Sequence, residues 1–324
     1  MKLLIQIPCY NEAETLGITL KTLPREVKGF DEVEWLIIDD GSTDNTVEVA
    51  KDNGVDHIVS FNKNLGLAKG FLAGLEACLK LGADVIVNTD ADNQYCSRDI
   101  PRLIKPILEQ KADIVVGRRH INRIKHFSAI KKMLQKLGSW VVRIASKTDI
   151  PDAPSGFRAI SREAAMRINV FNEYTYTLET IIQAGQKNMA VTSVLVRTND
   201  YLRPSRLSKS IASYIKRSII TIIRIFIVYQ PFKFFITIGL LLFFAGFYLG
   251  LRFIYYAYIL KDGTSRIQSL ILASILLGIG FQTILVAFLA DLIAANRKLT
   301  EDVQYRLRKI DLEDKNNKVE EKAK

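Results

Sequence analysis

The chain has 324 residues, enough for one sizeable α/β domain with an appendage, and its formal net charge is +11. The basic charge is concentrated: residues 117–147 hold nine Lys/Arg and no Asp or Glu, and residues 201–233 hold seven and none. Such concentration indicates an anionic partner: lipid headgroups, phosphorylated substrates or nucleic acid. The three cysteines lack disulfide or zinc-ligand spacing and the N-terminus lacks a signal-peptide apolar region, so we expect reduced thiols in a cytosolic domain.

Short apolar runs alternate with helical patterns along the first 200 or so residues. Strands are expected at 3–7, 34–38, 57–60, 84–88, 113–116 and 190–196, and helices from Asn11, from about 44 to 53, and at 67–80, 98–110, 127–146 and 176–186. Asn11 is expected to cap the first helix, with Glu14 as its reciprocal partner. This alternation predicts an α/β fold with a parallel, doubly wound sheet, in which ligands bind at the carboxyl ends of the strands.

Residues 233–258 and 267–290 are long and apolar enough to cross a bilayer, because about twenty helical residues span its ~30 Å core. Lys and Arg are more frequent in the segments before and after this pair than in the short connection between the two. The positive-inside bias therefore places the preceding domain and the tail in the cytoplasm. The predicted organisation is a domain at 1–205, a basic amphipathic juxtamembrane helix on anionic lipids at 206–232, the two membrane helices, and a charged tail at 291–324. Residues 300–324 are expected to be a frayed helix or disordered.

An acidic motif, Asn88–Gln94, follows the strand expected at 84–88. Asp90 and Asp92 stand two apart, and alternate residues of an extended chain point the same way, so both carboxylates can face one cation. Mg²⁺ and Mn²⁺ prefer such oxygen ligands. An isolated Asp-x-Asp is more often a solvated turn. Here the pair ends a predicted central strand, in line with two other strand-end motifs at 8–12 and 38–44.

Taken in order, these three motifs resemble the family-2 glycosyltransferases, which have a GT-A fold, that is, a Rossmann-like domain with a mostly parallel sheet. Within that family the chain is most similar to the polyprenyl-phosphate sugar transferases, of which dolichol-phosphate mannose synthase is the best-known type. The narrower resemblance rests on residues 116–119, 152–158 and 203–209 and on the two C-terminal apolar segments. Two departures are Arg206, where the family commonly has Gly, and Lys131 with Gln135, where it has Arg and Ser.

The resemblance implies a role for each matching residue. On the donor side, the nucleoside of a UDP- or GDP-sugar would be bound by Pro8, Tyr10, Asn11, Glu12 and Asp39 or Asp40. Asp90 would lie by the nucleotide and the metal, and the Mg²⁺ or Mn²⁺ ligands would be Asp90, Asp92 and Gln94. Asp92, Arg119 and Arg158 form the implied catalytic set, with Arg119, Ser155 and Arg158 lining the acceptor side. Arg203, Ser208 and Lys209 would hold diphosphate or lipid phosphate.

The implied activity is an inverting transfer of the sugar to polyprenyl phosphate on the cytoplasmic membrane face, for cell-envelope glycan or glycoconjugate synthesis. One alternative is transfer to a hydroxyl acceptor, for which Glu179 is the candidate base; another is a membrane scaffold that retains a sugar-nucleotide domain without catalysis. The basic runs lack interleaved aromatic residues, so nucleic acid is not expected as a partner. The sequence leaves open the sugar, the nucleotide and whether the chain forms a homo-oligomer.

Overall fold

The computed structural model describes residues 1–119, 129–170, 176–199, 220–221, 223–259 and 267–323. The chain divides into two compact units, which are described one at a time. The first is Met1–Ile219 together with Asp302–Lys324, and the second is Ile220–Glu301. The boundary predicted between residues 205 and 206 lies outside the described residues.

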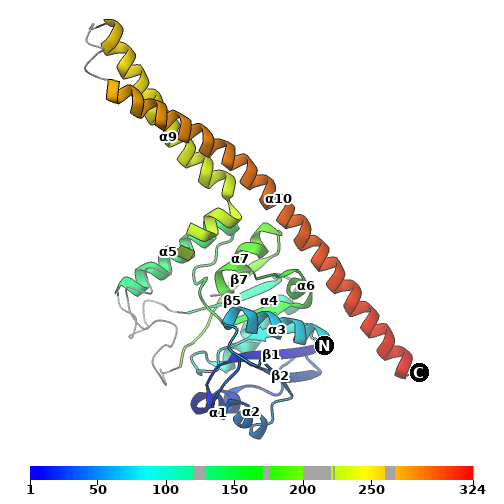
Figure 1. The fold of residues 1–324 in the computed structure, drawn as a ribbon. Helices are drawn as coiled ribbons and strands as arrows, with labels where there is room; N and C mark the ends of the chain where they lie inside the picture. The colour runs from blue at the N-terminus through cyan, green and yellow to red at the C-terminus, as the bar shows by residue number, and fades with distance from the viewer. Residues whose placement is uncertain (120–128, 171–175, 200–219, 222, 260–266, 324) are drawn as a thin grey trace. The chain divides into compact units, whose positions relative to one another are not determined.

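The described part of the first unit contains one seven-stranded sheet with the order β3-β2-β1-β4-β6-β5-β7 (Figure 1). The strands are β1 (Lys2–Cys9), β2 (Glu32–Asp39), β3 (His57–Ser60), β4 (Val85–Asn88), β5 (Ile114–Arg118), β6 (Arg158–Ser161) and β7 (Val191–Leu195). Neighbouring strands are parallel except at β6, which runs antiparallel to both β4 and β5. The predicted α/β class with a mostly parallel sheet is confirmed.

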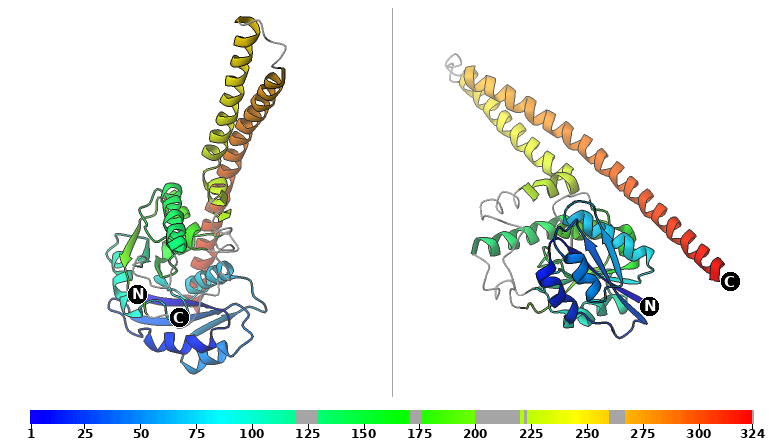
Figure 2. Two further views of the ribbon diagram at one scale, coloured as in Figure 1. Left: turned by 90° about the vertical axis from the view of Figure 1, so that its left-hand side faces the viewer. Right: turned by 60° about the horizontal axis from the view of Figure 1, so that its bottom comes forward.

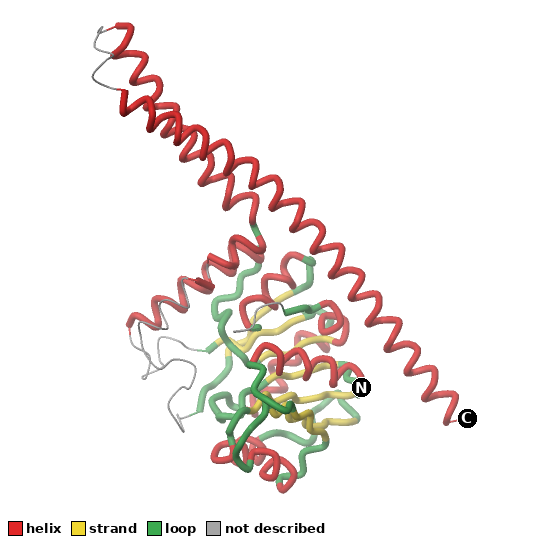
Figure 3. Tube along the Cα trace, in the orientation of Figure 1, coloured by secondary structure: helices red, strands yellow, loops and turns green. Residues whose placement is uncertain are grey.

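Helices cover both faces of this sheet (Figure 3). They are α1 (Ala13–Thr22), α2 (Thr46–Asp52), α3 (Leu67–Lys80), the 3₁₀ turn η1 (Ser97–Asp99), α4 (Ile100–Leu108), α5 (Ala129–Ser146), α6 (Arg162–Arg167) and α7 (Thr177–Gln186). Along β1, Leu3, Ile5 and Ile7 pack into a core with α1, α2 and α4. The alternate residue Leu4 packs into a second core with α3, α6 and α7. Both faces of β1 are therefore buried, as its nearly continuous apolar run requires.

Most predicted elements lie within a few residues of their expected positions, but β6 and α6 were not predicted. Their sequence, Arg158–Arg167, continues directly from strand to helix with no loop between them. Ser161 is the cap, because its Oγ accepts a hydrogen bond from the Ala164 amide at 3.2 Å. This antiparallel insertion places Arg158 beside Asn88 of β4, which matters for the candidate site.

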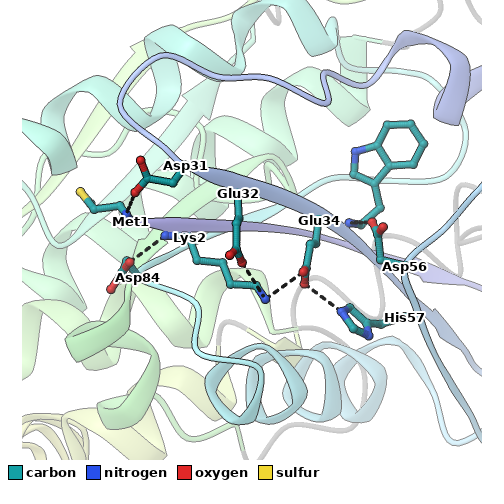
Figure 4. A network of polar contacts seen from close by, with 9 residues as sticks. Met1, Lys2, Asp31, Glu32, Glu34, Asp56, His57 and Asp84 are labelled. Atoms are coloured by element: carbon teal, nitrogen blue, oxygen red, sulfur yellow. Dashed lines mark hydrogen bonds and ion pairs between the residues drawn. The ribbon is translucent and has the colours of Figure 1, made fainter. Parts of the chain in front are cut away.

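An ionic network ties together the beginnings of β1, β2 and β3, at the opposite ends of these strands from the predicted motifs (Figure 4). Lys2 Nζ lies 3.3 Å from Glu32 Oε2 and 2.9 Å from Glu34 Oε1. Glu34 Oε2 in turn lies 2.8 Å from His57 Nε2. We assign this network to strand alignment, because it links neighbouring strands in register.

The second unit contains α9 (Pro231–Ile254), which continues into the π-helical turn η3 (Tyr255–Ile259), and most of α10 (Ile267–Ala323). Two candidate membrane spans lie at Pro231–Ile259 and within Ile267–Asp314, each with a mean hydropathy of 2.3. Only 11% and 17% of their most apolar windows are buried, so their apolar side chains face outward, as helices in lipid do. Of the juxtamembrane helix predicted at 206–232, residues 220–221 and 223–229 are described and helical, before α9 begins.

Glycines allow α9 and α10 to pack closely along the hairpin (Figure 2). A Cβ atom on Gly280 would lie 2.6 Å from the Phe243 backbone nitrogen, and one on Gly246 would lie 2.8 Å from that of Leu277. Without a hydrophobic force between helices in lipid, such close backbone contact is the main source of association.

The charged tail is helical as far as Ala323, so of the two alternatives expected for residues 300–324, a frayed helix or disorder, the structure has a helix. In the first unit, Tyr305 donates a hydrogen bond to Glu163 Oε1 at 2.8 Å. Arg308 Nη1 donates to the carbonyl oxygens of Met166 and Ile168 at 3.1 and 2.9 Å, just where α6 ends. These bonds satisfy carbonyls that the end of α6 leaves without helical partners.

Replacing Gly280 by Ala is expected to lower the melting temperature of the purified protein in detergent, because the new methyl group meets backbone atoms that cannot move aside. Overpacking of this kind costs about 1–3 kcal/mol. Gly278→Ala is the matched control, since a Cβ there has no described atom within 4 Å. Equal melting temperatures for the two variants would contradict the proposed helix contact.

Candidate functional site

The three motifs meet at the carboxyl edge of the sheet. Cys9 pairs with Asp39 where β1 and β2 end, and Gln6 pairs with Asn88 where β4 ends. The loops that follow these strands carry Pro8–Glu12, Asp39–Asp44 and Asp90–Gln94. The sheet order therefore brings together the residues that the sequence singled out on the donor side.

Hydrogen bonds lock the first two loops to each other. The Asn11 side chain accepts from the Thr43 amide at 2.8 Å, and the Asn11 amide donates to Ser42 Oγ at 2.9 Å. The Ala13 amide, at the start of α1, donates to Asp44 Oδ2 at 3.2 Å. The prediction that Asn11 caps α1 was thus wrong: the cap position is Glu12, which makes no capping bond with its side chain. The neighbouring loop supplies the acceptor instead.

Asp39 and Asp40 have different surroundings. Both oxygens of Asp40 are used, because they accept from the amides of Leu65 and Gly66 at 2.7 and 2.9 Å, just before α3. Asp39 Oδ1 accepts from the Ser42 amide at 3.0 Å, and no described residue donates to its Oδ2. Of the two, Asp39 is the better candidate for contacting a ligand. The nearby Tyr10 ring is 42% exposed, and Pro8 is half-buried.

Asp90 and Asp92 lie on the loop Asp90–Cys96, here called the aspartate loop. Both residues are half-buried, and Asp92 Oδ1 accepts from the Gln94 amide at 3.1 Å. No described residue donates a hydrogen bond to the Asp90 carboxylate. Burial, and then the charge of Asp92, raises the pKa of Asp90 to about 7. A carboxylate that lies beside another negative charge and accepts no hydrogen bond is chemically suited to binding a cation.

The donor set therefore fits a divalent metal ion of the Mg²⁺ or Mn²⁺ type. Two carboxylates and the amide oxygen of the half-buried Gln94 offer candidate oxygen ligands from one short loop. The described residues contain no cluster of three or more His, Cys, Asp or Glu placed to hold a metal. Mg²⁺ commonly takes one or two carboxylates and completes its shell with water and substrate phosphates.

Gly156 lies directly against Asp90. A Cβ atom at position 156 would be 2.9 Å from Asp90 Oδ1 and 3.2 Å from the Tyr176 hydroxyl oxygen. Both peptide groups of Gly156 are fixed: its amide donates to Tyr95 Oη at 3.0 Å, and its carbonyl accepts from Asn88 Nδ2 at 2.9 Å. The backbone behind Asp90 is consequently rigid, and it leaves room for a carboxylate only because residue 156 has no side chain.

Arg158 is fully buried beside Asn88 of β4, which corrects its expected place on an acceptor surface. Its guanidinium donates to Thr180 Oγ1 and to the carbonyl oxygens of Ala153, Ser155 and Thr177. Burial lowers the pKa of Arg158 to about 10, so it stays charged at neutral pH. Arg158 therefore acts on Asp90 through the electrostatic field of its positive charge. It also holds the backbone of residues 153–155 through hydrogen bonds to their carbonyl oxygens.

Arg119 is also buried, with 7% of its surface exposed. Its Nε and Nη2 atoms donate to Asp152 Oδ2 and Oδ1 at 2.8 and 3.0 Å, and its amide donates to Oδ2 at 3.0 Å. Burial by itself would lower the pKa of Arg119, but the interactions of its guanidinium with Tyr95 and Asp152 are stronger and raise the pKa above its ordinary value. Such a bidentate pair leaves the guanidinium little freedom to leave Asp152 for another anion. Ser155, the third residue expected on the acceptor side, is fully buried as well.

The predicted phosphate ligands Arg203, Ser208 and Lys209 lie outside the described residues. Sequence reasoning missed Asn88, Tyr95 and Tyr176, which hold Gly156 behind Asp90. Their signal was weak, because a polar residue at the end of a buried strand is identified only when its partners across the sheet are known. Gln6 is one such partner, donating to Asn88 Oδ1 at 2.9 Å.

The family described as "Glycosyl transferase family 2" matches residues 4–169. The undecaprenyl-phosphate mannosyltransferase of Micrococcus luteus is 31% identical over 177 residues, which cover 52% of this chain and 70% of that protein. The UDP-N-acetylglucosamine–dolichyl-phosphate N-acetylglucosaminyltransferase of Methanococcus voltae is 28% identical over 217 residues, covering 59% of this chain and 83% of that protein.

Among solved structures, the chain is similar to glucosyl-3-phosphoglycerate synthase from Mycobacterium tuberculosis in complex with Mn²⁺, UDP-glucose and phosphoglyceric acid. The TM-score is 0.53 at 17% sequence identity, and the match covers 68% of this chain and 79% of that one. At this identity the likeness concerns the fold alone, a GT-A-like α/β arrangement.

Gly156→Ala is expected to weaken Mn²⁺ binding while leaving the fold intact, because the new methyl group meets the movable carboxylate of Asp90. The measurement is Mn²⁺ titration followed by electron paramagnetic resonance, alongside thermal unfolding. We expect a loss of affinity of about tenfold or more. Gly138→Ala in α5, where a Cβ has no described atom within 4 Å, serves as the control. Unchanged Mn²⁺ affinity in the Gly156 variant would show that this packing does not set the position of Asp90.

Proposed function

Since the chain belongs to glycosyl transferase family 2, we propose that this glycosyltransferase moves a sugar from a UDP- or GDP-sugar to polyprenyl phosphate, with inversion, on the cytoplasmic face of a membrane. The observation that carries this proposal is the pair of half-buried carboxylates, Asp90 and Asp92, at the carboxyl edge of the sheet. Similar proteins whose names specify polyprenyl-phosphate acceptors support the acceptor class.

On the donor side, each loop has a separate task. Tyr10 and Asp39 present an exposed ring and an oxygen with no described donor toward the edge where the nucleoside would bind. Asp90, Asp92 and Gln94 would hold the divalent ion. When bound, this ion supplies positive charge that stabilises the departing nucleoside diphosphate. Asp40 and Asn11 act indirectly, by fixing the loops that carry the ligand-facing groups.

The acceptor chemistry explains why no catalytic base is needed. A phosphate monoester has a second pKa of about 6, so at neutral pH the acceptor is mostly a dianion and already a nucleophile. Its difficulty is repulsion from the donor diphosphate. We propose that Arg203, Ser208 and Lys209 hold the acceptor phosphate, because they lie in the basic stretch 201–233. The buried Arg119 and Arg158 are not proposed to touch the acceptor. They are proposed to contribute to the site through the electrostatic field of their positive charges and by shaping the aspartate loop.

The flanking charges support the proposed membrane side. Lys209, Lys216, Arg217 and Arg224 precede the first candidate span, and Lys233 lies in its first turn. Arg297, Lys298, Arg306 and Arg308 follow the apolar part of the second. Excess Lys and Arg is retained in the cytoplasm. With two spans, both flanks lie on that side, which is where nucleotide sugars are available and where the leaflet attracts basic segments.

A hydroxyl acceptor is the second candidate. It would require a base, and Glu179 in α7 is the carboxylate proposed for it. Glu179 is buried, with 6% of its surface exposed, and it lies one residue before Thr180, a partner of Arg158. That burial favours a structural role and hence the phosphate acceptor. The two candidates differ in the product, since only the phosphate acceptor yields a lipid-linked sugar.

Membranes containing the chain are expected to transfer radiolabelled sugar from a UDP- or GDP-sugar into a chloroform-extractable product, and only when Mg²⁺ or Mn²⁺ is present. Asp92→Asn should reduce this transfer at least about a hundredfold, because the ion that stabilises the leaving group loses a charged ligand. Asp52→Asn is the matched control, since Asp52 is exposed at the end of α2.

One outcome of that assay would refute the proposed function, and another would refute the metal-site assignment. Absence of lipid-linked label from every UDP- and GDP-sugar tested would favour the scaffold or the hydroxyl acceptor. Near-normal transfer by the Asp92 variant would remove Asp92 from the metal site.

A further inference from the structure

The segment Arg197–Asn199, here called the clamp, follows β7 and pairs with the far half of the aspartate loop. The Cys96 amide donates to the Arg197 carbonyl at 3.2 Å, and the Asn199 amide donates to the Gln94 carbonyl at 2.9 Å. Tyr95 and Thr198 form an antiparallel bridge between these two bonds. The loop that carries Asp92 and Gln94 is thus held by a short strand-like contact more than a hundred residues away in the sequence.

The side chain of Asn199 extends this contact along the loop. Its Nδ2 atom donates to the carbonyl oxygens of Asn93 and Tyr95 at 2.9 and 3.2 Å, and lies 3.2 Å from Asn93 Oδ1. Three oxygens around one atom identify that atom as the amide nitrogen and not the amide oxygen. With its backbone amide on Gln94, Asn199 alone binds three consecutive carbonyls of the loop.

These bonds fix the peptide groups on both sides of Gln94. Asn93 has a φ of 56°, in the left-handed region, so the chain reverses sharply between Asp92 and Gln94. A backbone of this kind keeps its conformation only where surrounding contacts hold it. Asn199 supplies these contacts at the residues that join the two candidate ligands.

Asn199 is itself anchored. Two residues earlier, the Arg197 amide donates to Asp99 Oδ2 at 2.7 Å, and its Nη2 donates to Oδ1 at 2.8 Å. Asp99 is fully buried at the start of α4; although burial opposes its charge, hydrogen bonds from Arg197 hold the pKa of this carboxyl below its ordinary value. The clamp therefore connects the aspartate loop to the sheet through β7 and to the core through α4.

We propose that Asn199 is a positioning residue that holds the aspartate loop in the geometry in which Asp92 and Gln94 bind the divalent ion. This inference rests on the proposed metal site. It places a metal-tuning residue after the last strand of the sheet, where no aspartate motif or metal-ligand spacing marks it. Partners of this kind, which orient ligands without touching the metal, typically change metal affinity by about 10–100-fold when they are lost.

The test compares Asn199→Asp with the wild-type chain in full-length, detergent-purified protein. Aspartate has nearly the same size as asparagine, but it replaces the donating Nδ2 atom with a carboxylate oxygen. This oxygen would repel the three loop oxygens that Asn199 Nδ2 now contacts. Mn²⁺ binding is measured by electron paramagnetic resonance in the presence of UDP or GDP, without any acceptor. We expect the dissociation constant for Mn²⁺ to rise about 10–100-fold, and Asn199→Ser, which keeps a single donor, to give an intermediate value.

Asn53→Asp is the matched control. The Asn53 side chain also donates to a backbone carbonyl, that of Val49 at 2.8 Å, but at the end of α2. We expect its Mn²⁺ affinity to equal that of the wild type, even if its melting temperature falls. Equal Mn²⁺ affinity in the Asn199→Ser variant and the wild type would overturn the inference, as would a wild-type chain that binds no Mn²⁺.

The Mn²⁺ measurement separates this inference from the proposed function. If the wild-type chain binds Mn²⁺ with UDP or GDP but makes no lipid-linked sugar, the acceptor assignment fails, and the Mn²⁺ affinities of the Asn199 variants still test the clamp. If transfer occurs and Asn199 variants bind Mn²⁺ normally, the function stands and the role of the clamp is refuted.

Discussion

Repulsion between Asp90 and Asp92 is the interaction on which the rest of the site depends. Carboxylates two residues apart, half-buried at the end of a central strand, destabilise each other, and burial and this repulsion together raise the pKa of Asp90 to about 7. A chain would relieve that cost by letting the loop relax unless other contacts prevented it. Here the loop is held from behind by Gly156 with its partners and from the side by Asn199. The folded protein thus keeps two carboxylates in an arrangement that is suited to a cation.

The buried arginines belong to the same arrangement. Arg158 and Arg119 carry positive charge beneath and beside Asp90, and their guanidinium groups are bound by backbone oxygens and by Asp152. Removing either would leave polar groups unpaired in a low-dielectric interior, which is costly. Loss of activity in such variants would therefore not by itself identify a residue that touches substrate. The ligand-facing groups are better sought among residues with side-chain oxygens that accept no hydrogen bond from a described residue.

The sequence was sufficient for the architecture. Nearly continuous apolar runs such as Leu3–Ile7, separated by helical patterns, predict buried parallel strands, and the parallel direction brings all strand-end motifs to one edge. It was insufficient for β6, because four residues that run antiparallel between β4 and β5 are specified by tertiary packing and not by their own periodicity. The sequence left the tail open between a frayed helix and disorder for a similar reason: Tyr305 and Arg308 have partners on α6 that composition cannot indicate.

For the candidate site, the sequence predicted which residues lie near the carboxyl edge of the sheet better than it predicted what their side chains contact. Asn11, Asp40, Arg119 and Arg158 were all singled out as ligand contacts, and all four use their side chains on protein groups. Whether a polar group faces a ligand or a neighbouring loop depends on long-range hydrogen bonds, which a single sequence does not reveal. Asn199 is the opposite case. Nothing in the sequence marks this asparagine, and its proposed positioning role depends on its hydrogen bonds to the aspartate loop.

A crystal structure with Mn²⁺ and a UDP- or GDP-sugar, analysed by anomalous diffraction at the manganese edge, tests the central claim most directly. The account predicts one manganese peak within coordination distance of Asp92 and Gln94 and beside Asp90, bridging to the diphosphate. A nucleotide bound at the carboxyl edge of the sheet, with no manganese at these side chains, would contradict it.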